Sequence, residues 1–213
     1  MMQIIPAVLP TTEKDYKDDL SRLERTGIFE WVHIDFMDNK FVPNQGIDPL
    51  VMAKHEFALK KEAHLMVQNP TNWIDKLVKA GFKRVLVHLE SDGDKEECLK
   101  YAKTKGLEVG LVLKHETPLE QLEPFIPKID VVLLMGVVPG FQGQPFIEGV
   151  LDKVKDFKSR QWSVKVGVDG AVRDTNIKKL VEAGVDFVTV GSFLLKGNID
   201  ENLERLWEVI NGS

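Results

Sequence analysis

His33 and Asp35 stand two residues apart in the segment WVHIDFMDNKFVPN, which spans residues 31–44. The aromatic and β-branched residues around them predict a strand, and the two-residue period of a strand places both side chains on one face. An imidazole and a carboxylate side by side can hold a divalent metal ion or take part in proton transfer. A hydrogen-bonded structural pair at a strand end uses the same residues, and this segment alone favours that simpler interpretation.

His64 and Asp169 also end predicted strands, and together with the first pair they favour a metal or proton-transfer site over a structural pair. With His33 and Asp35 they offer two imidazoles and two carboxylates, a set that suits Zn2+, Fe2+ or Mn2+ with positions left open for a substrate. Two aspartates that face a substrate from opposite sides can also remove a proton from one face and return one to the other. That exchange inverts a stereocentre next to a carbonyl, and a metal ion would oppose the negative charge of the intermediate.

Small residues follow the last three predicted strands. Glycine lets the backbone approach a phosphate group closely, and amides at the start of a helix bind the anion. Each glycine alone is best explained as a turn residue, but three such segments at neighbouring strand ends predict a phosphate site. The segments are Gly140-Phe141-Gln142-Gly143, Gly170-Ala171-Val172 and Gly191-Ser192.

Apolar strands and helical segments alternate along the chain. The predicted strands are residues 4–9, 31–36, 59–67, 83–89, 107–113, 129–137, 163–168 and 186–190. The predicted helices are residues 16–26, 49–55, 71–81, 95–105, 118–125, 147–158, 174–183 and 202–210, of which 49–55 has the weakest pattern. Regular alternation implies a parallel sheet.

Eight strand-then-helix units predict a closed (β/α)8 TIM barrel that occupies residues 1–213 as a single domain. An open doubly wound sheet would instead carry a G-x-G-x-x-G turn after its first strand. Here that turn reads Leu9-Pro10-Thr11-Thr12 and has no glycine. In a barrel every strand ends at the same rim, so the polar strand-end residues converge although they are far apart in sequence.

The charge balance argues against several classes of partner. The chain has 28 basic and 33 acidic residues, a net charge of -5 and no basic run, so neither nucleic acid nor an anionic membrane is an expected partner.

Its single cysteine, Cys98, excludes an internal disulfide and suits a reducing cytosol. The first residues lack the basic region of a signal peptide, and no apolar run reaches the roughly 18 residues of a membrane helix. We therefore expect a cytoplasmic protein.

Several motifs, in order and on matching strands, resemble the ribulose-phosphate 3-epimerase family nearly from end to end. They read HIDFMDNKFVPN, AHLMVQNP, MGVVPGFQGQPFI, VGVDGAV and GVDFVTVGS. The family form of the first motif is H-[IV]-D-x-M-D-G-x-F-V-P-N. The resemblance implies a TIM barrel of the ribulose-phosphate-binding type. It also implies interconversion of D-ribulose 5-phosphate and D-xylulose 5-phosphate through a cis-enediolate.

The same resemblance implies roles for individual residues. The matching ligands of one divalent ion (Zn, Fe or Mn) are His33, Asp35, His64 and Asp169, and Asp35 and Asp169 also match the acid/base pair. The residues that match phosphate or substrate contacts are His64, Gly140, Phe141, Gln142, Gly143, Gly170, Ala171, Gly191 and Ser192. Met37, Met66 and Met135 match methionines that pack near the intermediate, although core packing is the simpler role for any one of them. The expected partners are a phosphorylated ketose and further copies of the chain in a homo-oligomer.

Departures from the family pattern bear on the substrate. Pro10 replaces the serine of the family's I-L-S, which touches the substrate, and it offers neither a hydroxyl nor an N–H. Gln142 adds a side chain within G-F-G-G-Q, Ala171 replaces the second glycine of D-G-G, and Gly136 replaces the usual threonine. Asn39-Lys40 stands where Gly-His is common. None of these changes removes a metal ligand or a catalytic carboxylate.

Other functions stay open on the sequence. The same epimerisation of a ketohexose phosphate, such as allulose 6-phosphate, is one, because Pro10 and Gly136 could reflect a site reshaped for a longer sugar. A sugar-phosphate-binding barrel without turnover is opposed by the intact set of ligands. A related barrel lyase is opposed by the absence of a D-x-K-x-x-D motif. His88 and Lys114 also end strands, but a structural histidine and a solvated lysine explain them equally well.

Overall fold

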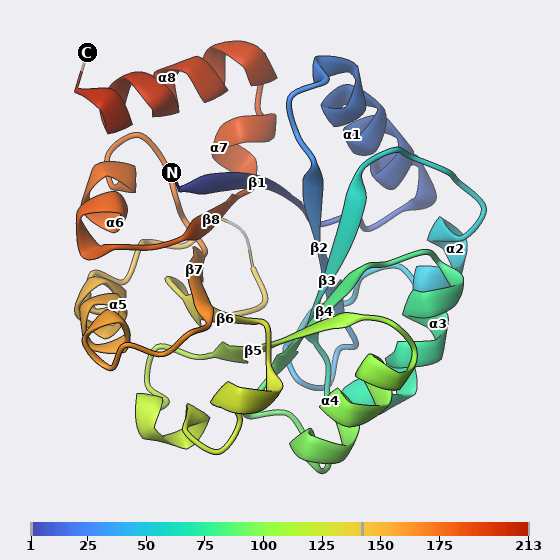
Figure 1. Ribbon diagram of the computed structural model, residues 1–213. Coiled ribbons are helices and arrows are strands. Elements are labelled where there is room, and N and C mark those ends of the chain that lie inside the picture. The colour runs from blue at the N-terminus through green and yellow to red at the C-terminus, as the bar shows by residue number, and fades with distance from the viewer. Residues whose placement is uncertain (1, 142, 213) are drawn as a thin grey trace.

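Eight parallel strands close into a barrel in the computed structural model, which describes residues 2–141 and 143–212. Each strand pairs with its neighbours in sequence, and β1 also pairs with β8, so no strand is left with an open edge (Figure 1). The predicted (β/α)8 barrel is confirmed. The strands are β1 Gln3–Val8, β2 Trp31–Met37, β3 Lys60–Met66, β4 Arg84–His88, β5 Glu108–Leu113, β6 Val131–Met135, β7 Lys165–Asp169 and β8 Phe187–Val190.

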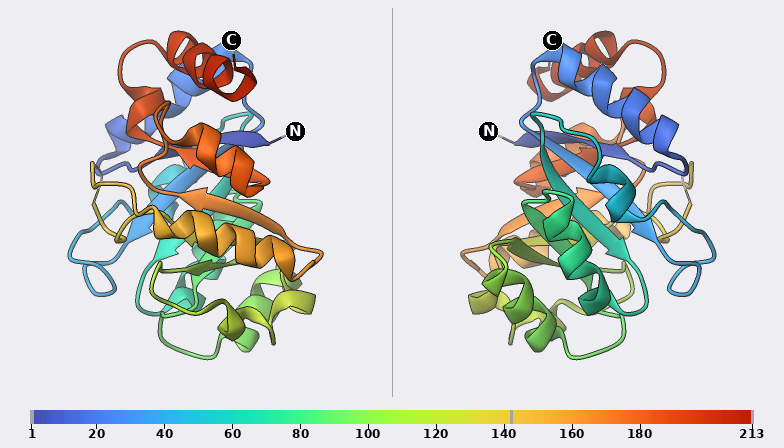
Figure 2. Two further views of the ribbon diagram at one scale, coloured as in Figure 1. Left: turned by 90° about the vertical axis from the view of Figure 1, so that its left-hand side faces the viewer. Right: turned by 90° about the vertical axis from the view of Figure 1, so that its right-hand side faces the viewer.

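Helices cover the outside of the barrel, with α5, α6 and α8 on one flank and α1, α2 and α3 on the other (Figure 2). The α-helices are α1 Glu13–Thr26, α2 Pro49–Met52, α3 Ile74–Lys79, α4 Lys95–Thr104, α5 Gly149–Ser159, α6 Ile177–Ala183, α7 Ser192–Leu195 and α8 Ile199–Asn211. The described residues also form three 3-10 turns: η1 Pro70–Trp73 leads into α3, and η2 Leu119–Leu122 and η3 Ile126–Lys128 lie between β5 and β6. No helix in the described residues is both long enough and apolar enough to cross a membrane.

The helix predicted at residues 118–125 is wrong in type, because this segment forms only the 3-10 turn η2 and a further turn, and η3 follows it. This segment and the residues directly after it contain three prolines, Pro118, Pro124 and Pro127. A proline inside an α-helix removes a backbone donor and clashes with the preceding turn, so only short pieces of helix form between them. The short helix α7 was not predicted, since its four residues are too few to show a period.

Local signals explain where the longer helices begin and end. The Thr12 side chain caps α1 by accepting from the Asp15 amide, and the Thr12 amide donates to the Asp15 carboxylate, which completes a capping box. Gly27 ends α1 in the left-handed conformation that glycine adopts without strain. Between these ends, Tyr16, Leu20 and Leu23 are fully buried against the barrel. Their helical spacing is what attaches α1 to the strands.

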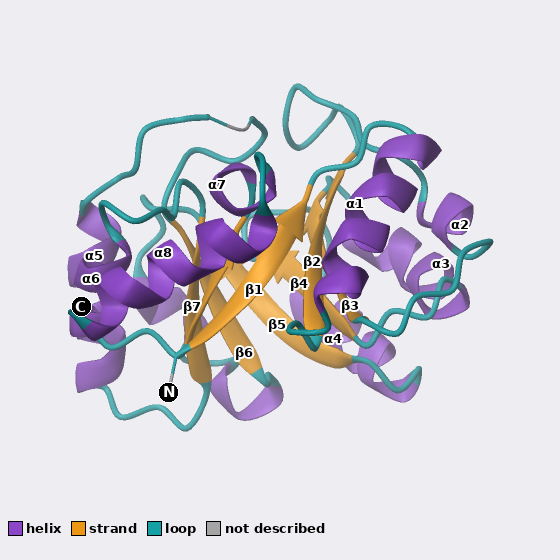
Figure 3. Ribbon diagram, turned by 90° about the horizontal axis from the view of Figure 1, so that it is seen from above, coloured by secondary structure: helices purple, strands orange, loops and turns teal. Residues whose placement is uncertain are grey.

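Apolar side chains fill much of the lower interior of the barrel. Leu86, Val112 and Leu133 belong to one buried cluster with the Phe187 ring. Gly167 makes room for that ring, since a Cβ there would lie 2.3 Å from Phe187 Cε2. A filled interior leaves only the rim at the carboxyl ends of the strands for binding and chemistry. In Figure 3 the loops after the strands rise above the barrel, and the N-terminus lies below it.

Candidate active site

The strand register brings four polar side chains close together at one end of the barrel: His33, Asp35, His64 and Asp169. On β2 and β3, Asp35 is paired with His64 and His33 with Glu62, so the H-x-D pair lies directly beside the E-x-H pair. Asp169 ends β7 and approaches from across the barrel. One ligand atom from each of His33, Asp35, His64 and Asp169 lies within 4.8 Å of the others. The sequence-predicted set is therefore brought together at one rim.

The imidazole nitrogens and carboxylate oxygens of this group lie so close together that they cannot all present lone pairs to one another. Asp35 Oδ1 lies 2.9 Å from His64 Nδ1 and 3.2 Å from His33 Nε2, and the two nitrogens lie 3.2 Å apart. Asp169 Oδ2 lies 3.6 Å from His64 Nδ1. Lone pairs at such distances repel unless a proton or a cation stands between them. The arrangement therefore has to hold positive charge at its centre.

Glu62 fixes which nitrogen of His33 faces the group. The Nδ1–H of His33 donates to Glu62 Oε1 at 2.7 Å, and both side chains are fully buried. A carboxylate can only accept, so Nδ1 carries the hydrogen and Nε2 is left to face Asp35. Carboxylate–histidine pairs of this kind orient the imidazoles that bind metal ions.

A second chain of hydrogen bonds orients His64. Burial lowers the pKa of His88 to about 4, so His88 is neutral at pH 7 and its one N–H, on Nδ1, donates to Glu90 Oε2 at 3.1 Å. Its Nε2 can then only accept, and it lies 3.0 Å from His64 Nε2. His64 must donate there, which leaves Nδ1 as the nitrogen that can bind a cation. His88 is thus a buried support of the site and does not line the pocket.

Two oriented imidazole nitrogens and two carboxylates form a set that fits a divalent metal ion such as Zn2+, Fe2+ or Mn2+. Burial alone would lower the pKa of His33, but its hydrogen bonds to Asp35 and Glu62 raise that pKa well above the ordinary value. A proton on His33 thus supplies positive charge in the cation-free protein. A metal ion that binds there must displace it.

The surroundings of Asp35 and Asp169 shift the pKa values of the two carboxyl groups in opposite directions. Burial alone would raise the pKa of Asp35, but hydrogen bonds with His33 and His64 lower it below the ordinary range. Burial raises the pKa of Asp169, and the negative charge of Asp35 raises it further. The Thr189 hydroxyl donates to Asp169 Oδ1 and holds this side chain in position. Two carboxyl groups whose pKa values are shifted in opposite directions are what a general base and a general acid need.

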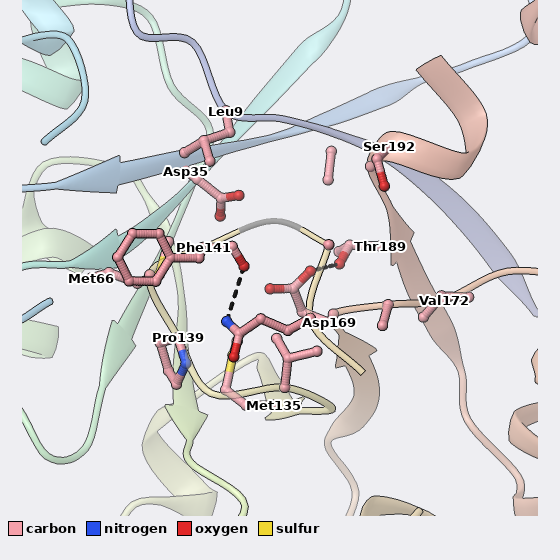
Figure 4. Close-up of a pocket in the computed structure, with 18 of the residues that line it drawn as sticks. Leu9, Asp35, Met66, Met135, Pro139, Phe141, Asp169, Val172, Thr189 and Ser192 are labelled. Atoms are coloured by element: carbon pink, nitrogen blue, oxygen red, sulfur yellow. Dashed lines mark hydrogen bonds between the residues drawn. The ribbon is translucent and has the colours of Figure 1, made fainter. Parts of the chain in front are cut away.

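A pocket opens above this group (Figure 4). Asp35 points into it from one side and Asp169 from the other, and Met37, Met66 and Met135 also line it. The histidines lie beneath the pocket: His33 and His64 are fully buried, and His64 is not among the lining residues. A ligand in this pocket would therefore meet the carboxylates directly.

Backbone amides line the side of the pocket nearest β7. Gly170 and Ala171 both have positive φ, +108° and +52°, and a Cβ at Gly170 would lie 2.5 Å from Val137 Cγ2. Left-handed backbone is strained for alanine, and such strain concentrates at functional sites. Within the described part of the chain, the amides of Gly170, Ala171 and Val172 donate to no other group. Unpartnered amides beside a pocket are suited to binding an anion.

The other predicted contacts fall around the same pocket. Gly191 and Ser192 line it from the start of α7, and Gly140, Phe141 and Gly143 line it from the loop after β6. Gln142, also predicted as a contact, lies outside the described residues. The loops after β2 and β6 meet here, because the side-chain amide of Asn44 donates to Gly140 O at 3.1 Å.

Two departures from the family pattern lie away from the pocket lining. Pro10 is buried, and Leu9 lines the pocket in its place. Gly136 is closely packed, since a Cβ there would lie 3.0 Å from both Gly170 O and Phe146 Cε2. The threonine that the family usually carries at this position would not fit without movement of the backbone. Lys114 stands over the Phe41 ring at 4.6 Å and does not line the pocket.

Sequence reasoning missed three residues of the site. Glu62 is two residues before His64 on a strand, so the same two-residue spacing that singled out His33 and Asp35 could have found it. Thr189 is a polar residue between valines in an otherwise apolar strand. Arg173, which follows the D-G-A-V motif, is exposed, lines the pocket and forms no salt bridge among the described residues.

Comparison with known proteins gives a family match over most of the chain. Residues 3–195 match the model of the ribulose-phosphate 3 epimerase family. A ribulose-phosphate 3-epimerase of Schizosaccharomyces pombe is 34% identical over 215 residues, which cover 99% of this chain and 91% of that protein. Proteins of the same name from Bacillus subtilis and Aquifex aeolicus are 32% and 36% identical, over 90% and 76% of this chain and 91% and 75% of their own lengths.

Similar solved structures share the fold at low identity. A mutant tryptophan synthase alpha-subunit from Pyrococcus furiosus aligns with a TM-score of 0.71 and 17% identity, over 99% of this chain and 98% of that one. A thiamine phosphate pyrophosphorylase from the same organism aligns with a TM-score of 0.65 and 14% identity, over 99% and 96%. At this identity the likeness supports the barrel alone.

Proposed function

The chain belongs to the ribulose-phosphate 3-epimerase family, and we propose that it is an isomerase that interconverts D-ribulose 5-phosphate and D-xylulose 5-phosphate. The observation that carries this proposal is the opposed pair Asp35 and Asp169, whose pKa values are shifted in opposite directions beside one pocket. An epimerase needs such a pair, because inversion of a carbon requires proton removal on one face and delivery on the other.

In one direction of the reaction, the ionised carboxylate of Asp35 takes the C3 proton of the bound sugar. The protonated Asp169 then gives a proton to the opposite face of the planar enediolate, which inverts C3. Each carboxyl group ends in the other's starting state, so the reverse reaction uses the same two groups with their roles exchanged. The Thr189 hydroxyl, which donates to Asp169 Oδ1, holds the carboxyl group at a fixed angle for this transfer.

We propose His33, Asp35, His64 and Asp169 as the ligands of a single divalent ion, Zn, Fe or Mn. When bound, such an ion would act as a Lewis acid that stabilises the negative charge developing on the substrate oxygens. Glu62 and His88 support this arrangement, since they determine which nitrogens of His33 and His64 face the substrate side. The buried methionines Met37, Met66 and Met135 keep water away from the reacting carbon.

The phosphate group of the substrate is proposed to lie against the wall of the pocket formed by the residues that follow β7 and β8. The free amides of Gly170, Ala171 and Val172 and the nearby backbone of Gly191 and Ser192 support this position. Arg173 adds a guanidinium at the pocket mouth, where it can pair with the same phosphate. A phosphate held there tethers the sugar so that C3 lies between the two carboxyl groups.

A ketohexose 6-phosphate, such as allulose 6-phosphate, is the alternative substrate. The two departures that could have indicated a longer sugar, Pro10 and Gly136, do not line the pocket, so they give no reason to prefer it. We therefore keep the pentulose 5-phosphate as the proposed substrate.

Paired assays of both sugars test this proposal. Purified, metal-loaded protein is expected to convert D-ribulose 5-phosphate with a kcat/KM at least tenfold above that for allulose 6-phosphate. In D2O, deuterium is expected to enter C3 of the pentulose. Turnover of neither sugar together with no deuterium at C3 would reject the epimerase assignment, whereas preference for the hexulose would change only the substrate.

A further inference from the structure

A single row of charged residues crosses the barrel interior below the active site. His33, Glu62, Arg84 and Glu108 occupy the same register on the neighbouring strands β2, β3, β4 and β5. Residues in register on parallel strands project from the same face of the sheet. The row therefore leads from a proposed metal ligand to the lower end of the barrel.

Each member of this row is bonded to the next. The Nδ1–H of His33 donates to Glu62 Oε1 at 2.7 Å, and Arg84 Nη1 donates to Glu62 Oε2 at 2.8 Å. Arg84 also donates from Nε and Nη2 to Glu108 Oε2 at 2.8 and 2.6 Å. Exposure rises along the row, with His33 and Glu62 fully buried and the side chains of Arg84 and Glu108 12% and 48% exposed.

Arg84 is held more rigidly than an ordinary surface arginine. Its guanidinium carbon lies 4.2 Å from the centre of the Trp31 ring, and its N–H groups reach two different carboxylates. A planar guanidinium stacked on an aromatic ring loses little further freedom when it binds a carboxylate. A fully buried carboxylate such as Glu62 is costly unless a positive group pairs with it. Arg84 is the permanently charged group that does so.

We propose that Arg84 is a positioning residue for the metal centre, and that it acts through Glu62 to set the hydrogen bond and metal affinity of His33. This inference rests on the proposed metal site but goes beyond it. Arg84 touches neither the pocket nor any of the four ligands. Arg84 holds one oxygen of Glu62 at 2.8 Å and so fixes the other oxygen against His33 Nδ1 at 2.7 Å, and this charge-assisted hydrogen bond makes the opposite nitrogen of His33 a better donor to a cation.

The competing explanation is that the row only stabilises the lower end of the barrel, as interactions at the amino-terminal ends of barrel strands generally do. The two explanations differ in what happens at the other end of the row. A purely stabilising Arg84 can be replaced without effect on metal affinity once the variant has folded. A positioning Arg84 cannot.

Three variants separate these explanations. Arg84→Met removes the charge but keeps an apolar chain against Trp31. Arg84→Lys keeps a positive charge next to Glu62 but loses the fork to Glu108. Glu108→Gln is the matched control, since it alters the solvent end of the row and leaves the contact between Arg84 and Glu62 in place. Circular dichroism of each metal-free protein confirms that it is folded.

Zn2+ affinity is measured by competition with a chromophoric chelator. Arg84→Met is expected to bind Zn2+ about 10–100-fold more weakly than the wild type, the usual effect of losing a group that supports a metal ligand. Arg84→Lys is expected to recover most of that loss. Glu108→Gln is expected to stay within about threefold of the wild type, because an exposed carboxylate contributes little.

Proton NMR of the zinc-loaded protein gives a second readout. The His33 Nδ1–H resonance is expected to lie strongly downfield in the wild type, to move upfield in Arg84→Met and to stay in place in Glu108→Gln. Wild-type affinity together with an unmoved resonance in folded Arg84→Met would overturn the proposal, as would equal losses in the Met and Lys variants. If the wild-type protein binds no Zn2+, Fe2+ or Mn2+, the metal site itself is wrong, and that outcome is distinct from a failure of Arg84.

Discussion

Asp35 and Asp169 project from strands on opposite sides of the barrel but approach the same atom, His64 Nδ1, at 2.9 and 3.6 Å. The difference between the two contacts matches the opposite directions of the two pKa shifts. Asp35, in closer contact with both imidazoles, has a lowered pKa, whereas burial and the charge of Asp35 raise the pKa of Asp169. A single histidine thus links the two carboxyl groups to which we assign proton transfer.

Asp169→Asn is expected to reduce epimerisation by about 10²–10⁴-fold, because the amide cannot exchange a proton with C3. The fold should survive, since asparagine has nearly the same shape and still accepts the Thr189 hydrogen bond. Initial rates of ribulose 5-phosphate conversion measure the loss. Asp152→Asn, at a position on α5 where the carboxylate is 85% exposed, is the control and should keep full activity.

The same variant also tests the two-sided mechanism. With Asp35 intact, Asp169→Asn should still exchange the C3 hydrogen of one pentulose epimer with D2O while it fails to convert that epimer to the other. NMR of the recovered sugars shows which epimer carries deuterium. Equal labelling of both epimers would show that proton transfer does not require Asp169.

The convergence of these residues could be predicted from the sequence because it depends on strand ends alone. Asp169 is the last residue of β7, Asp35 and His64 lie two residues before the ends of β2 and β3, and in a closed parallel barrel all strand ends share one rim. What could not be predicted was the support beneath them. The bond between Glu62 and Arg84 depends on the register between β3 and β4, which no local pattern specifies.

Removal of the metal ion is expected to abolish activity and to lower stability. A ligand that binds only the folded protein, at 100 times its Kd, raises the free energy of unfolding by about 2.7 kcal/mol. Denaturant unfolding with Zn2+ and after chelation measures this difference. His64→Gln should lose most of it, because His64 lies at the centre of the ligand set, whereas His115→Gln, on a surface loop, should behave as the wild type.

Metal affinity is also expected to rise with pH. Hydrogen bonds to Asp35 and Glu62 raise the pKa of His33 well above its ordinary value, so a proton competes with the cation at neutral pH. Zn2+ affinity should therefore increase between pH 6 and pH 8, with net release of protons on binding. Titration calorimetry in buffers of different ionisation enthalpy measures that release. An affinity independent of pH would contradict the proposed competition at His33.

Arg173→Ala is expected to raise the KM for ribulose 5-phosphate about 5- to 10-fold with little change in kcat, because a partly solvated charged hydrogen bond contributes roughly 1 kcal/mol. The effect should shrink as salt screens the guanidinium from the phosphate. Lys178→Ala, an exposed lysine on α6 that does not line the pocket, is the control for net charge. An equal rise in KM for both variants would assign the effect to the general surface charge.

Glu90 is expected to make stability depend on acid pH. Hydrogen bonds from His88, Thr117 and the Lys114 amide outweigh its burial and lower the pKa of Glu90 to about 2, from 4.5 for an ordinary glutamate. A lowered folded-state pKa stabilises the fold above pH 4.5, and this contribution is lost as the pH falls from 4.5 towards 2. Glu90→Gln should therefore lower the free energy of unfolding by about 1–3 kcal/mol at pH 7, and by less at pH 3.

Urea unfolding of both proteins at pH 7, 5 and 3 measures the change. The wild type is expected to lose more stability than Glu90→Gln between pH 5 and pH 3, because only the wild type has a carboxylate to protonate at this position. Glu182→Gln, an exposed residue on α6, should follow the wild-type profile. Parallel profiles for the wild type and Glu90→Gln would mean that Glu90 is not held ionised by His88 and Thr117, and the orientation that we infer for His64 would then lose its support.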